Sequence, residues 1–140
     1  MCLITDQKEP FIAKEDIPVY KFLVRRENGS LRRNFSPFYH YKFKHGSNTP
    51  NGRKDISLDF LEFHNIVNGG FLHAYVGRSI AKSSWFADTF MWFDRKIVKM
   101  YIPKGAEYYL SLDATEICAT ELVWKYPFRK IIEFFKKKKD

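Results

Sequence analysis

Several segments of this chain place β-branched and aromatic side chains at every second position and end at residues that break a strand, which points to an antiparallel sheet. The segment 17–26, IPVYKFLVRR, has this character and is followed by the turn-forming residues 27–30. The segment 96–102 ends at Pro103, which cannot donate to a strand ladder, and Gly105 then turns the chain. Residues 71–76 follow two glycines and have the same pattern.

Weaker signals complete the expected sheet. Residues 34–44 alternate aromatic and polar side chains, and residues 45–55 carry turn-forming residues throughout, which predicts a loop. Residues 56–67 fit either a strand or a short helix, because their apolar positions satisfy both periods. Residues 106–110 are expected to continue the pairing, and residues 117–125 are expected to form one last strand after a loop at 111–116.

Two segments have helical spacing. Residues 78–94 place Trp85, Met91 and Trp92 on one face, and residues 127–139 begin at Pro127 with apolar residues at helical intervals. The first 16 residues predict an extended arm. The expected fold is therefore α+β: one domain over residues 1–140, with an antiparallel sheet of five or six strands, one internal helix and a C-terminal amphipathic helix that continues into a basic tail at 127–140.

The net charge of +8 is concentrated in two blocks. Residues 21–54 hold nine basic residues and one acid, and residues 125–140 hold seven basic residues and two acids. If the blocks meet in space, their combined field attracts a polyanion. The alternative is an ordinary soluble protein with a basic surface.

The sequence also predicts several absences. No stretch approaches the roughly 20 apolar residues of a membrane span, and residues 1–10 lack the apolar run of a signal peptide, so we expect a cytoplasmic protein. Cys2 and Cys118 are the only cysteines, which provides no disulfide framework. His64 and His73 lack a recognised metal spacing, so no metal site and no resident cofactor are expected. The oligomeric state is left open.

The stretch 32–44, RRNFSPFYHYKFK, is the strongest candidate for ligand binding. Single-stranded nucleic acids and nucleotides are held by aromatic stacking together with Lys or Arg at the phosphates. The expected ligand-binding residues are Arg25, Arg32, Arg33, Phe38, Tyr39, Tyr41, Lys42, Lys44, Arg53 and Lys54, with Lys136, Lys137, Lys138 and Lys139 as a basic tail. The alternative is a strand with aromatic residues in the core and lysines that protect its edge.

Three segments resemble a loose group of small uncharacterised proteins encoded by bacteriophages and mobile elements of gut bacteria. They are the opening MCLITDQKEP, the strand VYKFL, and IVKMYIPKGAEYY with its IPKG-x-x-YY turn at 102–109. The resemblance implies a phage-type protein that acts in the cytoplasm of a host cell, where binding a nucleic acid or a nucleotide signal would counteract a host process.

The order of the expected elements is also similar to that of ADP-ribosyltransferases. This similarity implies an NAD-using enzyme in which Arg25 on the first strand, Tyr75 on a central strand and Glu121 near the last strand carry the reaction. Our first hypothesis remains a non-enzymatic binding protein for a phosphate-bearing ligand. The alternatives are this enzyme, or a relative that has lost activity, and an inhibitor that docks on an acidic protein partner.

Overall fold

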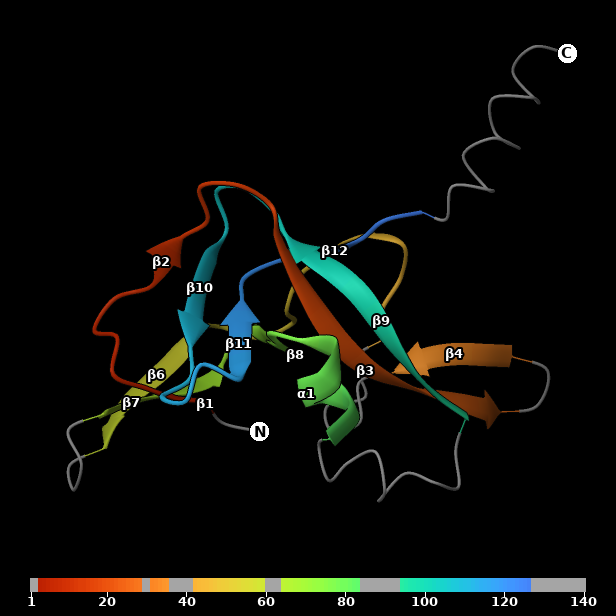
Figure 1. The fold of residues 1–140 in the computed structure, drawn as a ribbon, viewed down its shortest axis with the longest axis horizontal. Helices are drawn as coiled ribbons and strands as arrows, with labels where there is room; N and C mark the ends of the chain where they lie inside the picture. Colours follow the sequence, from red (N-terminus) through yellow and green to blue (C-terminus); the bar gives the residue numbers. More distant parts are fainter. Residues whose placement is uncertain (1–2, 29–30, 36–41, 60–63, 84–93, 127–140) are drawn as a thin grey trace, which may run out of the picture.

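The structure is a computed structural model that describes residues 3–28, 31–35, 42–59, 64–83 and 94–126 (Figure 1). Twelve strands and one short helix, α1 (Arg78–Ser83), form the regular structure of these residues. All strand pairs are antiparallel, and they form two sheets. Within the described residues, no helix has the length and hydropathy needed to cross a membrane.

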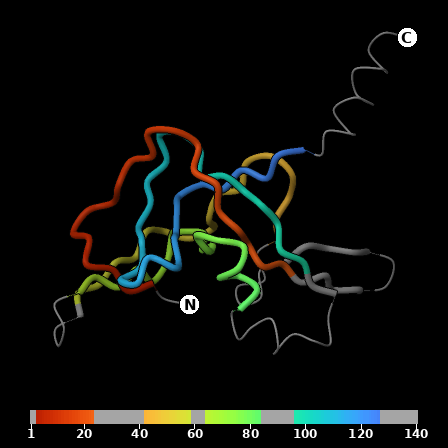
Figure 2. Tube along the Cα trace, in the orientation of Figure 1, coloured from red at the N-terminus to blue at the C-terminus, as the bar shows by residue number. Residues whose placement is uncertain are grey.

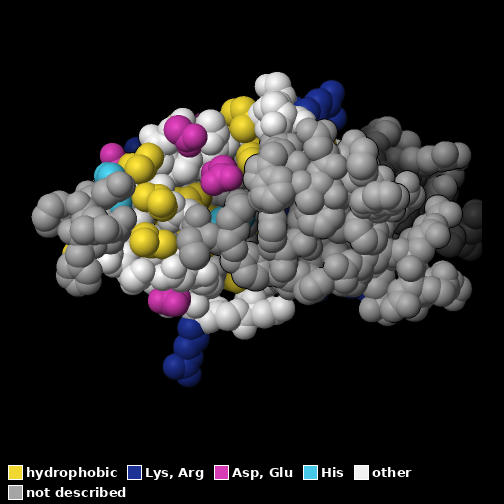
Figure 3. Space-filling view, turned by 90° about the horizontal axis from the view of Figure 1, so that it is seen from below, with side chains coloured by type: hydrophobic (Ala, Val, Ile, Leu, Met, Phe, Trp, Pro, Cys, Tyr) yellow, Lys and Arg dark blue, Asp and Glu magenta, His cyan; other side chains and the backbone are white. Residues whose placement is uncertain are grey.

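The smaller sheet has three strands. Its order is β1 (Leu3–Thr5), β7 (His64–Gly69) and β6 (Asp55–Asp59). Seen from below, hydrophobic side chains are exposed over this part of the molecule (Figure 3). The exposed apolar residues of this sheet include Ile4, Ile56 and Leu58. The small sheet thus presents apolar rather than basic surface.

The larger sheet has the order β2-β10-β11-β8-β3-β9-β12-β5, and β4 pairs with β3 beside this path. Its strands are β2 (Phe11–Ile12), β3 (Ile17–Asn28), β4 (Leu31–Phe35), β5 (Gly46–Asn48), β8 (Leu72–Tyr75), β9 (Asp94–Ile102), β10 (Glu107–Leu110), β11 (Glu116–Ala119) and β12 (Leu122–Trp124). Residues 3–12, predicted as part of an extended arm, contribute β1 to one sheet and β2 to the other, and run alongside β10 (Figure 2).

The two longest strands, β3 and β9, pair with each other in the middle of the larger sheet (Figure 1). Their register runs without a break from Ile17 opposite Ile102 to Arg25 opposite Asp94. The other edge of β3 is shared, because β8 pairs with it at Tyr20 and β4 pairs with it from Val24 onward. The first part of β3 therefore pairs with β8, and its last part pairs with β4 and forms the β3–β4 hairpin.

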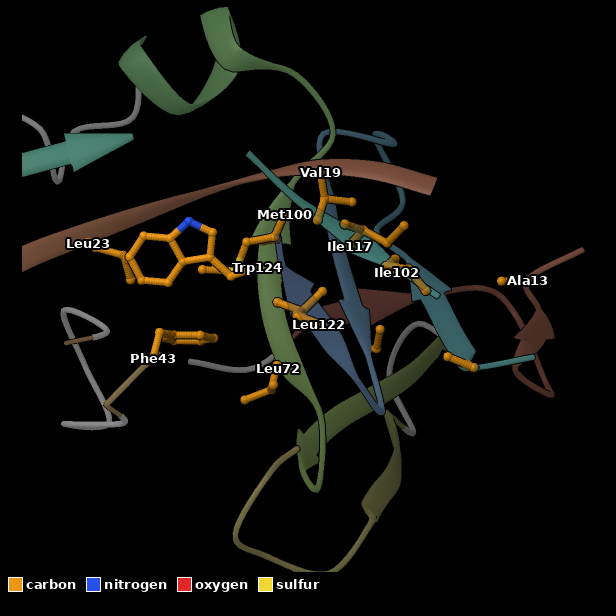
Figure 4. Close-up of a cluster of buried hydrophobic side chains, with 13 residues drawn as sticks. Ala13, Val19, Leu23, Phe43, Leu72, Met100, Ile102, Ile117, Leu122 and Trp124 are labelled. Atoms are coloured by element: carbon orange, nitrogen blue, oxygen red, sulfur yellow. The ribbon is translucent and has the colours of Figure 1, made fainter. Parts of the chain in front are cut away.

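The chain turns a corner between β11 and β12, which brings the two halves of the larger sheet around one core. Ala119 ends a strand that pairs with β8, and Leu122 begins a strand that pairs with β9 and β5. Both halves contribute to the main hydrophobic cluster. Leu23, Phe43 and Trp124 lie together at one end of it, and Ile102 and Ala13 lie toward the other end (Figure 4).

A second cluster lies on the opposite face of β8, β10 and β11. Its members are Leu3, Val67, Phe71, Tyr109 and Cys118, so the small sheet packs against this face. Adjacent residues of β11 divide between the clusters, since Ile117 belongs to the first and Cys118 to the second. Such alternation is what the two-residue period of a strand requires.

The prediction of an α+β fold with a five- or six-stranded sheet and two helices is wrong, because the described chain is mostly β, with twelve strands in two sheets. The predicted strand at 117–125 is two strands, and the predicted loop at 45–55 contains β5. Of the predicted helix at 78–94, residues 78–83 are helical and the rest lies outside the described residues, as does the predicted helix at 127–139. Strands of two to five residues depend on distant partners, and local periodicity does not reveal them.

Candidate functional site

Three cationic side chains and two tyrosine rings form a row on the outer face of the larger sheet, here called the cation–tyrosine row. Arg78, the first residue of α1, places its guanidinium carbon 5.5 Å from the ring centroid of Tyr20 on β3. Tyr101 on β9 holds two ammonium groups, Lys99 Nζ at 5.4 Å and Lys125 Nζ at 4.1 Å from its centroid. The row therefore crosses from α1 over β3 and β9 to the end of β12.

The register of the sheet produces this row. Tyr20 lies opposite Lys99, and Tyr101 lies opposite Val123, which places Lys125 two residues further along the same face. The alternate residues of the same strands, Val19 on β3 and Met100 on β9, are buried in the core. Burial of one face thus fixes the other set of side chains on the outside.

The cations of the row are exposed and have no acidic partner in the described part of the chain. No ion pair joins Arg78, Lys99 or Lys125 to a carboxylate among these residues. The ion pair between Lys54 and Glu107 belongs to a different region. A row of this kind produces a local positive field, because no carboxylate of the described residues forms an ion pair with its cations.

One carboxylate lies near the row by register. Glu116 on β11 is opposite Tyr75 on β8, and Tyr75 is opposite Tyr20. Burial raises the pKa of Glu116, the charge of Asp113 raises it further, and the buried ammonium group of Lys21 opposes both. Cross-strand pairs therefore connect Glu116 to Tyr75, Tyr75 to Tyr20, and Tyr20 to Lys99.

A stack of aromatic rings lies on the other face of β12, here called the ring stack. The ring of His45 lies 4.1 Å from Trp124 and 5.4 Å from Tyr126 between centroids, at interplanar angles of 32° and 22°. Lys96 Nζ lies 4.9 Å from the centroid of Trp124. Lys125 stands between Trp124 and Tyr126 in sequence and points to the opposite face, so β12 joins the ring stack to the cation–tyrosine row.

The loop before β5 holds His45 in the stack. The amide group of Asn48, buried with 1% exposure, accepts a hydrogen bond from Lys44 N and donates to the carbonyl oxygens of Lys44, Gly46 and Leu122. Gly46 has a φ of +96°, a conformation that side-chain-bearing residues rarely adopt. His45 Nδ1 also lies 3.2 Å from the carbonyl oxygen of Lys125.

Lys21 lies inside the larger sheet beneath the row. Its side chain is only 8% exposed, and its ammonium group donates to the carbonyl oxygen of His73 at 2.6 Å and lies 5.5 Å from the ring centroid of Phe43. Burial lowers the pKa of Lys21 to about 8, and Glu116 opposes this effect. Burial and then the charge of Lys21 lower the pKa of His73 to about 3, which keeps that imidazole neutral.

The structure distributes the predicted ligand-binding residues over separate places. Lys42 and Lys44 are exposed near β5, whereas Arg53 and Lys54 are exposed before β6, where Lys54 pairs with Glu107 on β10. Arg25, Arg32 and Arg33 belong to the β3–β4 hairpin, opposite Asn34, Glu27 and Arg26 respectively. Phe38, Tyr39, Tyr41 and Lys136 to Lys139 lie outside the described residues.

The register does not bring together the three residues of the enzyme hypothesis. Tyr75 lies opposite Glu116 on β11, whereas Glu121 is five residues further along, past the corner between β11 and β12. Arg25 is likewise five residues beyond Tyr20, the partner of Tyr75 on β3. Glu121 accepts a hydrogen bond from the hydroxyl group of Ser47 at 2.8 Å, beside β5.

Other reactive groups offer no alternative centre among the described residues. Cys118 is fully buried, and burial raises the pKa of its thiol to about 12. No group of three His, Cys, Asp or Glu residues in the described ranges has the geometry to hold a metal ion. No protein-family model matches this chain, and comparisons with curated proteins and with solved structures find no significant match.

Sequence reasoning missed the residues of the cation–tyrosine row, although it predicted the strands that carry them. The sequence does contain the alternation that places these residues on one face. Tyr20 lies between apolar positions of β3, and Lys99 and Tyr101 lie on either side of the apolar Met100 in β9. Each segment predicts a polar outer face. That these faces adjoin follows only from the pairing of residues 79 positions apart.

Proposed function

We propose that this protein binds single-stranded nucleic acid through the cation–tyrosine row. The observation that carries the proposal is the set of three exposed cations, Arg78, Lys99 and Lys125, aligned on one sheet face over tyrosine rings. Sheet faces that carry aromatic rings and cations are a common platform for single strands, and in this row the part played is neutralisation of the phosphates by Lys and Arg.

The geometry of the row supports binding of phosphate. An ammonium group over a ring face is held by the ring quadrupole and keeps its N–H donors for an incoming acceptor. Lys99 and Lys125 both lie over the ring of Tyr101, so this part of the row offers two cations to neighbouring phosphates of one strand. The net charge of +8 adds a long-range attraction for a polyanion.

The test is the binding of a fluorescently labelled 12-nucleotide single strand, as DNA and as RNA, over a salt series. If Arg78, Lys99 and Lys125 each neutralise a phosphate, the logarithm of affinity falls with the logarithm of salt with a slope of about −2. The double variant K99E/K125E removes two phosphate contacts, which reduces the magnitude of the slope by about 1.4. Charge reversal also weakens binding at low salt.

The matched control is K8E/K14E, which makes the same change of charge at two exposed lysines outside the row. Equal losses in the two double variants would mean that net charge alone governs binding, which contradicts a defined site. Tight binding of a mononucleotide without binding of the 12-mer would also reject the proposal. No binding of either ligand at low salt would leave an acidic protein partner as the next hypothesis.

A further inference from the structure

The outermost ring of the ring stack is open to solvent. Tyr126 is 56% exposed, the highest value among the exposed large hydrophobic residues of the described chain. One face of its ring stacks with His45 at an interplanar angle of 22°. The remaining exposure therefore includes ring surface that another planar group can cover.

The stack is anchored in the core, which fixes the position of this ring surface. Trp124 is only 8% exposed and lies with Leu23 and Phe43 at one end of the main cluster (Figure 4). His45 is held by the carbonyl oxygen of Lys125, and its loop is held by the four hydrogen bonds of Asn48. A preorganised ring surface loses little conformational entropy when it binds a planar group.

Lys96 Nζ lies 4.9 Å from the ring centroid of Trp124 in the same stack, and two further lysines adjoin Tyr126 and His45 in the chain. Lys125 precedes Tyr126 in sequence and belongs to the cation–tyrosine row, and Lys44 precedes His45 and is exposed. A ligand that is planar and carries an adjacent negative charge fits this combination. A nucleobase with its phosphate has both properties, and a strand bound along the row reaches Tyr126 by turning around the end of β12 beyond Lys125.

We infer that Tyr126 binds one unpaired nucleobase by extending the ring stack, while Lys125 binds the adjacent phosphate. This inference rests on the proposed function and specifies its ligand, because the bases of a duplex are already stacked and are not available to the ring. The inference adds a contact to the base itself, whereas the cation–tyrosine row needs only the phosphates.

The experiment compares two labelled 12-mers with the same number of phosphates: oligothymidine, and a strand in which every base is replaced by an abasic sugar. We expect the native protein to bind oligothymidine at least fivefold more tightly than the abasic strand, which is the contribution of one stacked base. Tyr126→Ala brings this ratio to about one. Tyr126→Phe retains the preference, because it retains the ring.

The control is Phe11→Ala, which truncates an aromatic residue that is 48% exposed on β2 and packs edge-to-face with Tyr108. This variant keeps the preference for oligothymidine. Equal affinity of the native protein for both strands, or an unchanged ratio in Tyr126→Ala, would overturn the stacking inference while phosphate recognition by the row stands. Failure to bind either strand would overturn both.

Discussion

The ammonium group of Lys21 donates a hydrogen bond to the main-chain carbonyl oxygen of His73, 2.6 Å away, next to the single point where β3 and β8 pair. A lysine side chain thus links two strands whose backbones are joined in register only through Tyr20 and Tyr75. The cost is a buried positive charge, which lowers the pKa of Lys21 from 10.5 to about 8.

This buried charge makes stability depend on pH in a defined direction. Below about pH 8 the amine is protonated in both the folded and the unfolded protein, and the folded state carries the full cost of burying the charge. Between pH 8 and 10.5 the folded state loses the proton first, so the unfolded state binds more protons and stability rises with pH. We expect a gain from this group of about 2 to 3 kcal/mol between pH 7 and 10.

Comparison with Lys21→Met isolates this contribution. Cys118 and Tyr109 have raised pKa values and lower the stability of both proteins at high pH, so their effects cancel in the difference. Urea unfolding of both proteins at pH 7 and pH 10 should show that the unfolding free energy of the native protein, relative to that of the variant, is higher at pH 10. A difference in unfolding free energy that is the same at both pH values would contradict a buried, protonated Lys21.

Asn48 should be among the most sensitive polar positions of the chain. Its buried amide group makes four hydrogen bonds that close the 44–48 loop onto β12. Asn48→Ala leaves these main-chain groups without their partner and should cost about 2 to 4 kcal/mol of unfolding free energy. Asn68→Ala, which removes one exposed hydrogen bond to Ser57, should change stability by less than about 1 kcal/mol in the same urea titration. Equal losses would contradict this role of Asn48.

Gly70 combines two constraints that Gly46 does not share. Both have positive φ, +80° and +96°, but a Cβ on Gly70 would lie 2.4 Å from the backbone N and Cα of Lys54, whereas one on Gly46 meets nothing within 4 Å. Gly46→Ala should therefore cost about 1 to 2 kcal/mol from conformation alone. Gly70→Ala should cost at least 3 kcal/mol, because the backbone beside it must also move. Thermal unfolding of both variants checks this order, and a reversed order would contradict the close approach.

The sequence was sufficient to predict the long elements and insufficient for the pairing of the short ones. The strands predicted at 17–26, 71–76 and 96–102 are found at 17–28, 72–75 and 94–102, because period-two patterns bounded by Gly and Pro specify an extended chain locally. Gly46–Asn48 was predicted as loop because its residues favour turns. It is a strand because Asn48 is buried against β12, which is a tertiary effect.

The candidate site has the same limitation. The predicted aromatic ligand-binding residues all lie in the stretch 32–44, and within it Phe43 is 2% exposed and belongs to the core. The cation–tyrosine row instead draws its residues from α1, β3, β9 and the end of β12. A single sequence shows which residues alternate on a strand, and it does not show which strands adjoin.

Glu116 provides a test in which a substitution should strengthen binding. It is the carboxylate that cross-strand register connects to Tyr20 and Lys99 through Tyr75, so its charge opposes a phosphate on the cation–tyrosine row. Glu116→Gln removes this charge and keeps the shape of the side chain. We expect affinity for the labelled 12-mer to rise about twofold in 10 mM salt, where the Debye length is about 30 Å, and the gain to shrink in 0.15 M salt, where it is about 8 Å.

The control for this prediction is Glu9→Gln, which makes the same change at an exposed acid between β1 and β2. If the two variants gain equally, net charge explains the effect and the position of Glu116 contributes nothing. If Glu116→Gln weakens binding, the carboxylate acts in favour of the ligand, and the ligand approaches from a direction other than the cation–tyrosine row. A gain confined to Glu116→Gln and reduced by salt would support phosphates bound closer to Glu116 than to Glu9, as binding along the cation–tyrosine row requires.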